Sequence, residues 1–128
     1  MIYPATDASF ESYSHRTFTD YFLTHEDCVY FWNQYAPTQA QRANPYVSPA
    51  RAQSHRGLPP GLIITAEFDP LRDEGEAYAE ILRAAGGSGK ATRYNGMIHG
   101  FYSMAGILDQ AGAAIEESAL ALKAACRS

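Results

Sequence analysis

Two residues in the sequence have the types and positions needed to carry out proton transfer together. Asp69 follows a run of apolar residues that begins at Leu62, and His99 follows a shorter run that ends at Tyr94. A carboxylate that accepts the Nδ1–H of a histidine fixes its tautomer and leaves Nε2 free to take a proton from a serine. Because the unperturbed pKa of histidine lies near neutrality, the pair is a candidate acid (Asp69) and base (His99) for acyl transfer.

The sequence contains no evident nucleophile for this pair. A serine on a G-x-S-x-G elbow would be expected, and that pattern does not occur. Ser88 stands among glycines, but Lys90 occupies the position of the second required glycine. The segment Gly86–Lys90 only faintly resembles a phosphate loop, and we interpret it as a flexible turn. The other serines considered are Ser9, Ser12, Ser14, Ser48, Ser54 and Ser103.

Asp69 and His99 each have a structural interpretation as well. An aspartate before a proline commonly opens a turn, and a lone histidine is usually a surface or structural residue. Their positions favour a function, because ligands of open α/β sheets bind beyond the carboxyl ends of the strands. In addition, Gly96 and Gly100 lie close to His99 and allow the backbone to turn sharply there.

The second half of the chain alternates strand and helix patterns. Asn95-Gly96 is a turn signal, although the following residues do not form a clean returning strand. This order predicts a parallel α/β arrangement with right-handed crossovers and about three strands in all. The expected elements are a strand at Leu62–Phe68, a helix opened by a capping box of Asp73 and Glu76 and closed by Gly86-Gly87, a strand at Lys90–Tyr94, and an amphipathic helix from Ile107 to about Ala125.

The first sixty residues give weaker signals. Met1–Tyr3 is a very short apolar run, and its position suggests that further sequence precedes it. Thr24 is a plausible N-cap for a helix that extends to Tyr35, and prolines make residues 37–60 a long irregular connection. The aromatic residues of this half have two interpretations, the lining of an acyl pocket or ordinary core, and core is favoured: Phe18, Tyr21, Phe22, Phe31, Trp32 and Tyr35.

Composition limits the possible partners. The 128 residues suffice for one compact domain, and a net charge of −4 without a basic stripe argues against nucleic acid. No apolar run is long enough for a membrane span and no signal peptide is evident, so we expect a cytoplasmic protein. Cys28 and Cys126 are interpreted as unrelated thiols rather than a disulfide or redox pair.

No metal or cofactor is expected from the sequence. The histidines His15, His25 and His55 show no metal-ligand spacing with one another or with the cysteines. Asp73, Glu74 and Glu76 are interpreted as the charged first turn of a helix, where the helix dipole favours acidic residues.

Several stretches resemble the hormone-sensitive-lipase-like branch of the α/β-hydrolase family, the bacterial carboxylesterases. They are LPPGLIITAEFDPLRDEGEAYAEILRAAG and YNGMIHGFYSM, supported by IYPATD and NPYVSP. The resemblance implies that Asp69 is the acid and His99 the base of a Ser-His-Asp triad. It also implies that residues 1–128 are the C-terminal portion of the fold, with strand, helix and long loop in 1–60 and the acid and base in 61–128. The HGGG oxyanion motif and the GDSAGG nucleophile motif of that family are not in the sequence.

Two functions follow as hypotheses. In the first, the chain is part of a carboxylic-ester hydrolase for small acyl esters and is inactive alone. In the second, it is a non-catalytic fragment that associates with itself or with a missing N-terminal half, because bare strand edges and apolar patches promote association. A peptidase or dienelactone-type hydrolase of the same fold is a third and weaker alternative.

Overall fold

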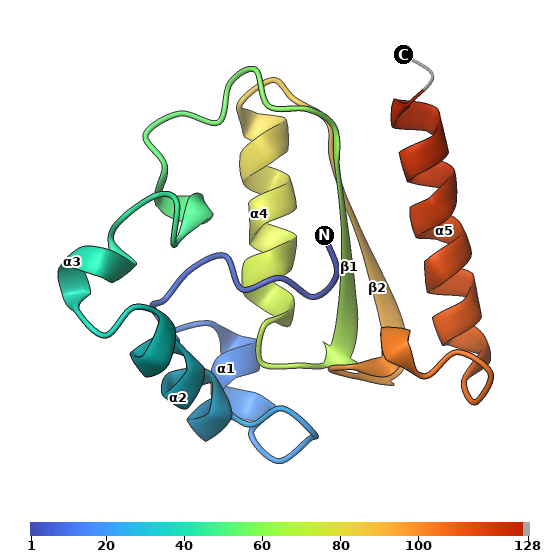
Figure 1. The fold of residues 1–128 in the computed structure, drawn as a ribbon, viewed down its shortest axis with the longest axis horizontal. Helices are drawn as coiled ribbons and strands as arrows, with labels where there is room; N and C mark the ends of the chain where they lie inside the picture. Colours follow the sequence, from blue (N-terminus) through green and yellow to red (C-terminus); the bar gives the residue numbers. More distant parts are fainter. Residues whose placement is uncertain (127–128) are drawn as a thin grey trace.

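The computed structural model describes residues 1–126, which form a small parallel sheet between two long helices. Strands β1 (Gly61–Phe68) and β2 (Gly89–Ile98) pair in parallel. Helix α4 (Arg72–Ala84) connects them and covers one face, while α5 (Asp109–Ala125) covers the other (Figure 1). The predicted parallel α/β class and the strand–helix–strand–helix order are therefore confirmed.

The third expected strand is reduced to a single parallel bridge between Ile2 and Ile64. Tyr3 donates a main-chain hydrogen bond of 2.7 Å to the Ile64 carbonyl, and Ile64 donates one of 2.9 Å to Met1. Pro4 follows directly and has no N–H to donate, so the ladder does not continue. Met1–Tyr3 nevertheless lies along β1 as a short parallel segment.

Strand β1 is buried on both faces, as its continuous apolar run predicts. Ile63 packs against Tyr78 and Leu82 of α4. Ile64 belongs to a second cluster that includes Ala111 of α5. Successive side chains of a strand point to opposite faces, so Ile63 packs towards α4 and Ile64 towards α5. The sheet is therefore held between the two helices.

The predicted capping box at the start of α4 is wrong. The helix begins at Arg72, and its N-cap residue Leu71 makes no side-chain cap. Asp73 instead exchanges hydrogen bonds with Ser14, and Glu76 binds Thr65 and Arg93. Tertiary partners have thus taken both carboxylates away from the local capping role that their spacing suggested.

Strand β2 extends four residues beyond the predicted end at Tyr94, to Ile98. Asn95-Gly96 forms an irregularity within this strand instead of a hairpin turn. A short 3₁₀ helix η2 (Phe101–Ser103) then leads towards α5.

The N-terminal half places short helices where the strands end (Figure 1). Helices α1 (Tyr13–Thr17) and α2 (His25–Tyr35) lie there, and Thr24 caps α2 as predicted, in a capping box with Asp27. The connection 37–60 is less irregular than expected, because it contains α3 (Gln39–Arg42), capped by Thr38, and the 3₁₀ helix η1 (Pro49–Arg51). Within residues 1–126, no helix has the length and apolar character to cross a membrane.

Candidate active site

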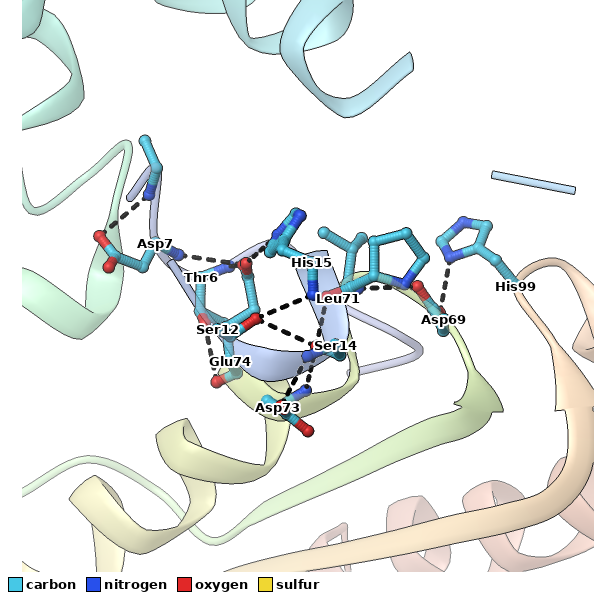
Figure 2. A network of polar contacts seen from close by, with 12 residues as sticks. Thr6, Asp7, Ser12, Ser14, His15, Asp69, Leu71, Asp73, Glu74 and His99 are labelled. Carbon is cyan, nitrogen blue, oxygen red and sulfur yellow. Dashed lines mark hydrogen bonds and ion pairs between the residues drawn. The ribbon is translucent and has the colours of Figure 1, made fainter. Parts of the chain in front are cut away.

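The structure brings Asp69 and His99 into direct contact at the carboxyl ends of β1 and β2. Nδ1 of His99 lies 2.8 Å from Oδ2 of Asp69 (Figure 2). Phe68 and Ile98 are register partners, and Asp69 and His99 are the next residue along each chain. The parallel pairing of two neighbouring strands therefore sets the two side chains side by side.

The two residues differ in exposure in the way that an orienting carboxylate and a general base require. The side chain of Asp69 is fully buried, whereas that of His99 is 21% exposed. The other carboxylate oxygen of Asp69, Oδ1, accepts the Leu71 N–H at 2.9 Å. Each oxygen of the carboxylate thus has its own partner: Oδ1 binds the main chain, and Oδ2 binds the imidazole.

The backbone after His99 turns sharply. Gly100 adopts a φ of 86°, in the left-handed region that favours glycine. A Cβ atom at Gly100 would lie 3.1 Å from Cε1 of Phe22, so the Phe22 ring also limits this position. The loop that carries His99 is therefore packed against the segment between α1 and α2.

Tyr3 also contacts the imidazole of His99, and sequence reasoning missed it. The two ring centroids are 4.2 Å apart. Tyr3 has a φ of 31°, which is uncommon for a residue with a side chain and costs conformational energy. No sequence signal would find this, because a residue before a proline is normally expected to be extended.

A buried polar network anchors the N-terminal segment to the turn that holds Asp69 (Figure 2). Ser14 donates a hydrogen bond to the Pro70 carbonyl, and its own N–H donates to Asp73. Glu74 accepts from the Thr6 N–H at 2.6 Å and lies 2.9 Å from Nε2 of His15. The expected place of Glu74 in the charged first turn of α4 is confirmed, and its carboxylate is in addition buried and joins two segments.

Cys28 is buried and Cys126 is exposed, and both are free thiols, as predicted. Burial raises the pKa of the Cys28 thiol to about 12, and the negative charges of Asp69 and Glu74 add to the effect. A thiol that stays protonated near neutral pH is a poor nucleophile. Cys28 is accordingly a packing residue close to the acidic turn.

The aromatic residues of the first half are mostly not core, contrary to the favoured interpretation. Only Trp32 is buried, while the rings of Phe22, Phe31 and Tyr35 are largely exposed. Tyr21, also exposed, stacks on Phe68 at a centroid distance of 5.1 Å, next to Asp69 in sequence. Tyr21 and Phe22 therefore pack beside Phe68 and Gly100, the sequence neighbours of Asp69 and His99, without being enclosed in the core.

An open cavity of about 530 Å³ lies at the other end of β1. It is apolar and bounded by Met1, Leu62, Leu82 and Leu122, among others, and neither Asp69 nor His99 lines it. The size of the cavity does not connect it with proton transfer. We therefore assign the candidate site from the hydrogen bond between Asp69 and His99 and not from the cavity.

No serine of the described residues 1–126 makes a hydrogen bond to His99. Ser14 is engaged with Pro70, and Ser12 caps α1. Ser48 is buried with an unpartnered hydroxyl group, and Ser88 lies in the turn before β2, where its carbonyl accepts from Gly61. The part of the chain that the structure describes brings an acid and a histidine together and hydrogen-bonds no serine hydroxyl to the histidine.

Comparison with known proteins gives consistent matches. A family model described as the alpha/beta hydrolase fold matches residues 1–103. The chain is 39% identical over 126 residues to the carboxylic ester hydrolase LipN of Mycobacterium tuberculosis, which covers 97% of this chain and 34% of that protein. It is 37% identical over 112 residues to an ethyl acetate hydrolase of Pseudomonas putida, covering 87% of this chain and 35% of that protein.

Solved structures agree with these matches. A hyperthermophilic esterase from Pyrobaculum calidifontis superposes with a TM-score of 0.90 and 38% identity, over 96% of this chain and 41% of that one. A thermostable esterase from Pseudomonas putida gives a TM-score of 0.75 and 51% identity over 78% of this chain and 32% of that one. The chain thus spans about a third of the length of the curated relatives it matches.

Proposed function

Because this chain belongs to the alpha/beta hydrolase family and matches its carboxylesterases, as the hormone-sensitive-lipase-like motifs predicted, we propose that it supplies the acid and base of a carboxylic-ester hydrolase. Asp69 is the triad acid and His99 the triad base. The observation that carries this proposal is the 2.8 Å contact between His99 Nδ1 and Asp69 Oδ2.

The roles follow from the geometry of the pair. With its proton on Nδ1, His99 donates to Asp69 and presents Nε2 as the basic nitrogen. When Nε2 removes the proton from a serine hydroxyl, the imidazole becomes an imidazolium, which the buried carboxylate stabilises. Asp69 remains ionised throughout, and Nε2 later returns the proton to the leaving alcohol.

The serine and the oxyanion donors must come from residues other than those described, since the pair alone is a base and its orienter. The chain on its own is therefore expected to be inactive on p-nitrophenyl esters. Small acyl esters are the proposed substrate class, in line with the relative that is named an ethyl acetate hydrolase. The exposed rings of Tyr21 and Phe22 beside the pair suit contact with the apolar part of such an ester.

A chimera tests the proposal. This chain would replace the matched region of the Pyrobaculum calidifontis esterase, whose remaining residues complete the fold. We expect ester hydrolysis by the chimera, with a loss in kcat of about 10⁴ on Asp69→Asn and of about 10⁶ on His99→Ala. Glu116→Gln, an exposed change on α5, serves as the control and should leave the rate unchanged.

Two results would contradict the proposal. One is an active chimera whose rate is unaffected by His99→Ala. The other is ester turnover by the isolated chain that disappears with His99→Ala, because that result would place a nucleophile within these 128 residues.

A second candidate role is that of a non-catalytic, self-associating module in the cytoplasm. It is favoured by the exposed apolar side chains of α5 and the loop before it, where Ile107, Leu120 and Leu122 are 84%, 60% and 66% exposed. Exposed apolar patches of this kind are typical of interaction surfaces. Light scattering after size exclusion distinguishes the cases, since a clean monomer at micromolar concentration would count against self-association.

A further inference from the structure

The pairing of β1 and β2 contains an irregularity just before the candidate site. Ala66 pairs with Tyr94, and the next register pair is Phe68 with Ile98. One residue of β1, Glu67, therefore opposes three residues of β2, Asn95 to Met97. Strand β2 carries two extra residues at this point, which is an enlarged β-bulge.

This bulge decides which residue of β2 meets Asp69. Asp69 lies three positions after Ala66, so an uninterrupted register would place the residue three positions after Tyr94, Met97, beside it. The two extra residues bring His99 to that place. Parallel pairing resumes after the bulge at Phe68 and Ile98, directly before the two site residues.

The side chain of Glu67 closes the gap that the bulge leaves in the ladder. Its Oε2 accepts the Gly96 N–H at 2.6 Å. Gly96 has a φ of 78°, so its backbone is turned out of the strand and its N–H needs a partner other than a β1 carbonyl. On the other side of the bulge, Gln110 of α5 donates to the Asn95 carbonyl at 3.1 Å.

Glu67 is itself held in place. Its main-chain carbonyl accepts a hydrogen bond of 3.1 Å from Nη1 of Arg72, at the start of α4. Arg72 is buried and also binds Asp73, and its guanidinium lies 4.8 Å from the Phe18 ring centroid. The carboxylate of Glu67 thus extends from a fixed point of the backbone to the bulge.

We infer that Glu67 is a positioning residue for His99: its carboxylate holds the two-residue bulge of β2 in the conformation that sets His99 opposite Asp69. Its relevance to catalysis rests on the function proposed above. Glu67 makes no hydrogen bond to His99, and it acts through Gly96, which lies in β2 three residues before His99.

The test is proton NMR of the ¹⁵N-labelled chain, following the Nδ1 proton between His99 and Asp69. In the unmodified chain we expect a downfield resonance that exchanges slowly with water. In Glu67→Ala its exchange should be about tenfold faster, as expected when one net hydrogen bond that holds the bulge is lost. Glu67→Gln keeps an acceptor oxygen at the same reach and should restore slow exchange.

Two further variants separate positioning from a general effect. Glu116→Ala removes one exposed carboxylate from α5 and should leave the resonance unchanged. Glu67→Asp keeps the charge but shortens the side chain by one methylene. Its Nδ1 proton should exchange faster than that of the unmodified chain, so this variant tests the inference if Glu67→Ala does not fold. The unfolding equilibrium constant of the folded variants in urea should rise by no more than about tenfold, because the same single hydrogen bond is lost.

The outcomes distinguish this inference from the proposed function. Slow exchange in the unmodified chain, unchanged in Glu67→Ala and Glu67→Asp, would overturn the positioning role and leave the Asp69–His99 pair intact. A folded, unmodified chain without the downfield proton would remove the pair itself, and with it both proposals.

Discussion

Ser14 donates a 2.6 Å hydrogen bond to the carbonyl of Pro70, the residue that follows Asp69. The Ser14 hydroxyl also accepts the Asp73 N–H, so its partners are the turn between β1 and α4 and the first turn of α4. Figure 2 shows that these contacts join α1 to the turn that carries the acid. A segment 56 residues away in sequence therefore fixes the backbone on which Asp69 stands.

Replacing Ser14 by alanine should destabilise the chain. The buried Pro70 carbonyl and the Asp73 N–H would lose their partner, at a cost of about 1–3 kcal/mol in the free energy of unfolding. Urea denaturation followed by circular dichroism measures this difference. Ser54→Ala is the matched control, since Ser54 is exposed, and equal effects of the two changes would contradict the anchoring role of Ser14.

Glu76 should make part of the stability depend on pH. Burial opposes ionisation of its carboxyl group, but hydrogen bonds from Arg93 and Thr65 outweigh this and lower its pKa. A carboxyl group whose pKa is lower in the folded state than in the unfolded state contributes stability above its unfolded pKa, and that contribution is lost as the pH falls through the folded pKa. The free energy of unfolding should therefore decrease as the pH falls below about 5, where a free glutamate, with a pKa of about 4.3, begins to take up protons.

Glu76→Gln should flatten this acid decrease, because glutamine does not titrate. Urea unfolding at a series of pH values from 3 to 7 (roughly the range that spans glutamate titration) measures the slope for each variant. Glu80→Gln is the control, because Glu80 pairs with Arg83 on the exposed surface of the same helix, where ion pairs contribute little. An unchanged slope in Glu76→Gln would show that other carboxylates carry the pH dependence.

The two cysteines should differ in reactivity. The pKa of Cys28 is raised to about 12 by burial and by the charges of Asp69 and Glu74, so almost no thiolate exists near neutral pH. Iodoacetamide should therefore add one group to the native chain, at the exposed Cys126, and two groups in urea. Mass spectrometry counts the adducts, with Cys126→Ser as the control that should give none in the native state. Rapid native labelling of that variant would mean that Cys28 is accessible.

Gly89 and Gly112 should respond in opposite ways to alanine. A Cβ atom at Gly89 would lie 2.3 Å from the Ala79 carbonyl oxygen, a clash with backbone that costs about 1–3 kcal/mol. A Cβ atom at Gly112, inside α5, meets nothing within 4 Å, and alanine there should stabilise the helix by about 0.5–1 kcal/mol. Thermal unfolding of the two variants gives the signs, and stabilisation by Gly89→Ala would contradict the packing of α4 against β2.

The sequence by itself determined the features that depend on local pattern. A continuous apolar run with β-branched residues predicted β1, and Thr24 with Asp27 predicted the start of α2. Both signals are local, because the pattern of apolar residues and the capping hydrogen bonds each involve only a few neighbouring residues. The positions of Asp69 and His99 just beyond their strands were also evident, since the sequence shows directly which residue follows each predicted strand. The family motifs add the α/β-hydrolase assignment, which the match over residues 1–103 confirms.

Only the tertiary structure decided how those pieces meet. The two-residue bulge opposite Glu67, the contact of Tyr3 with His99 and the anchoring of the Asp69 turn by Ser14 join residues that are far apart in the chain. The capping prediction for Asp73 failed for the same reason, because a distant Ser14 competed successfully for its carboxylate. Local patterns specify the direction and burial of each element, whereas the register between strands and the partners of buried polar groups depend on the free energy of the whole fold.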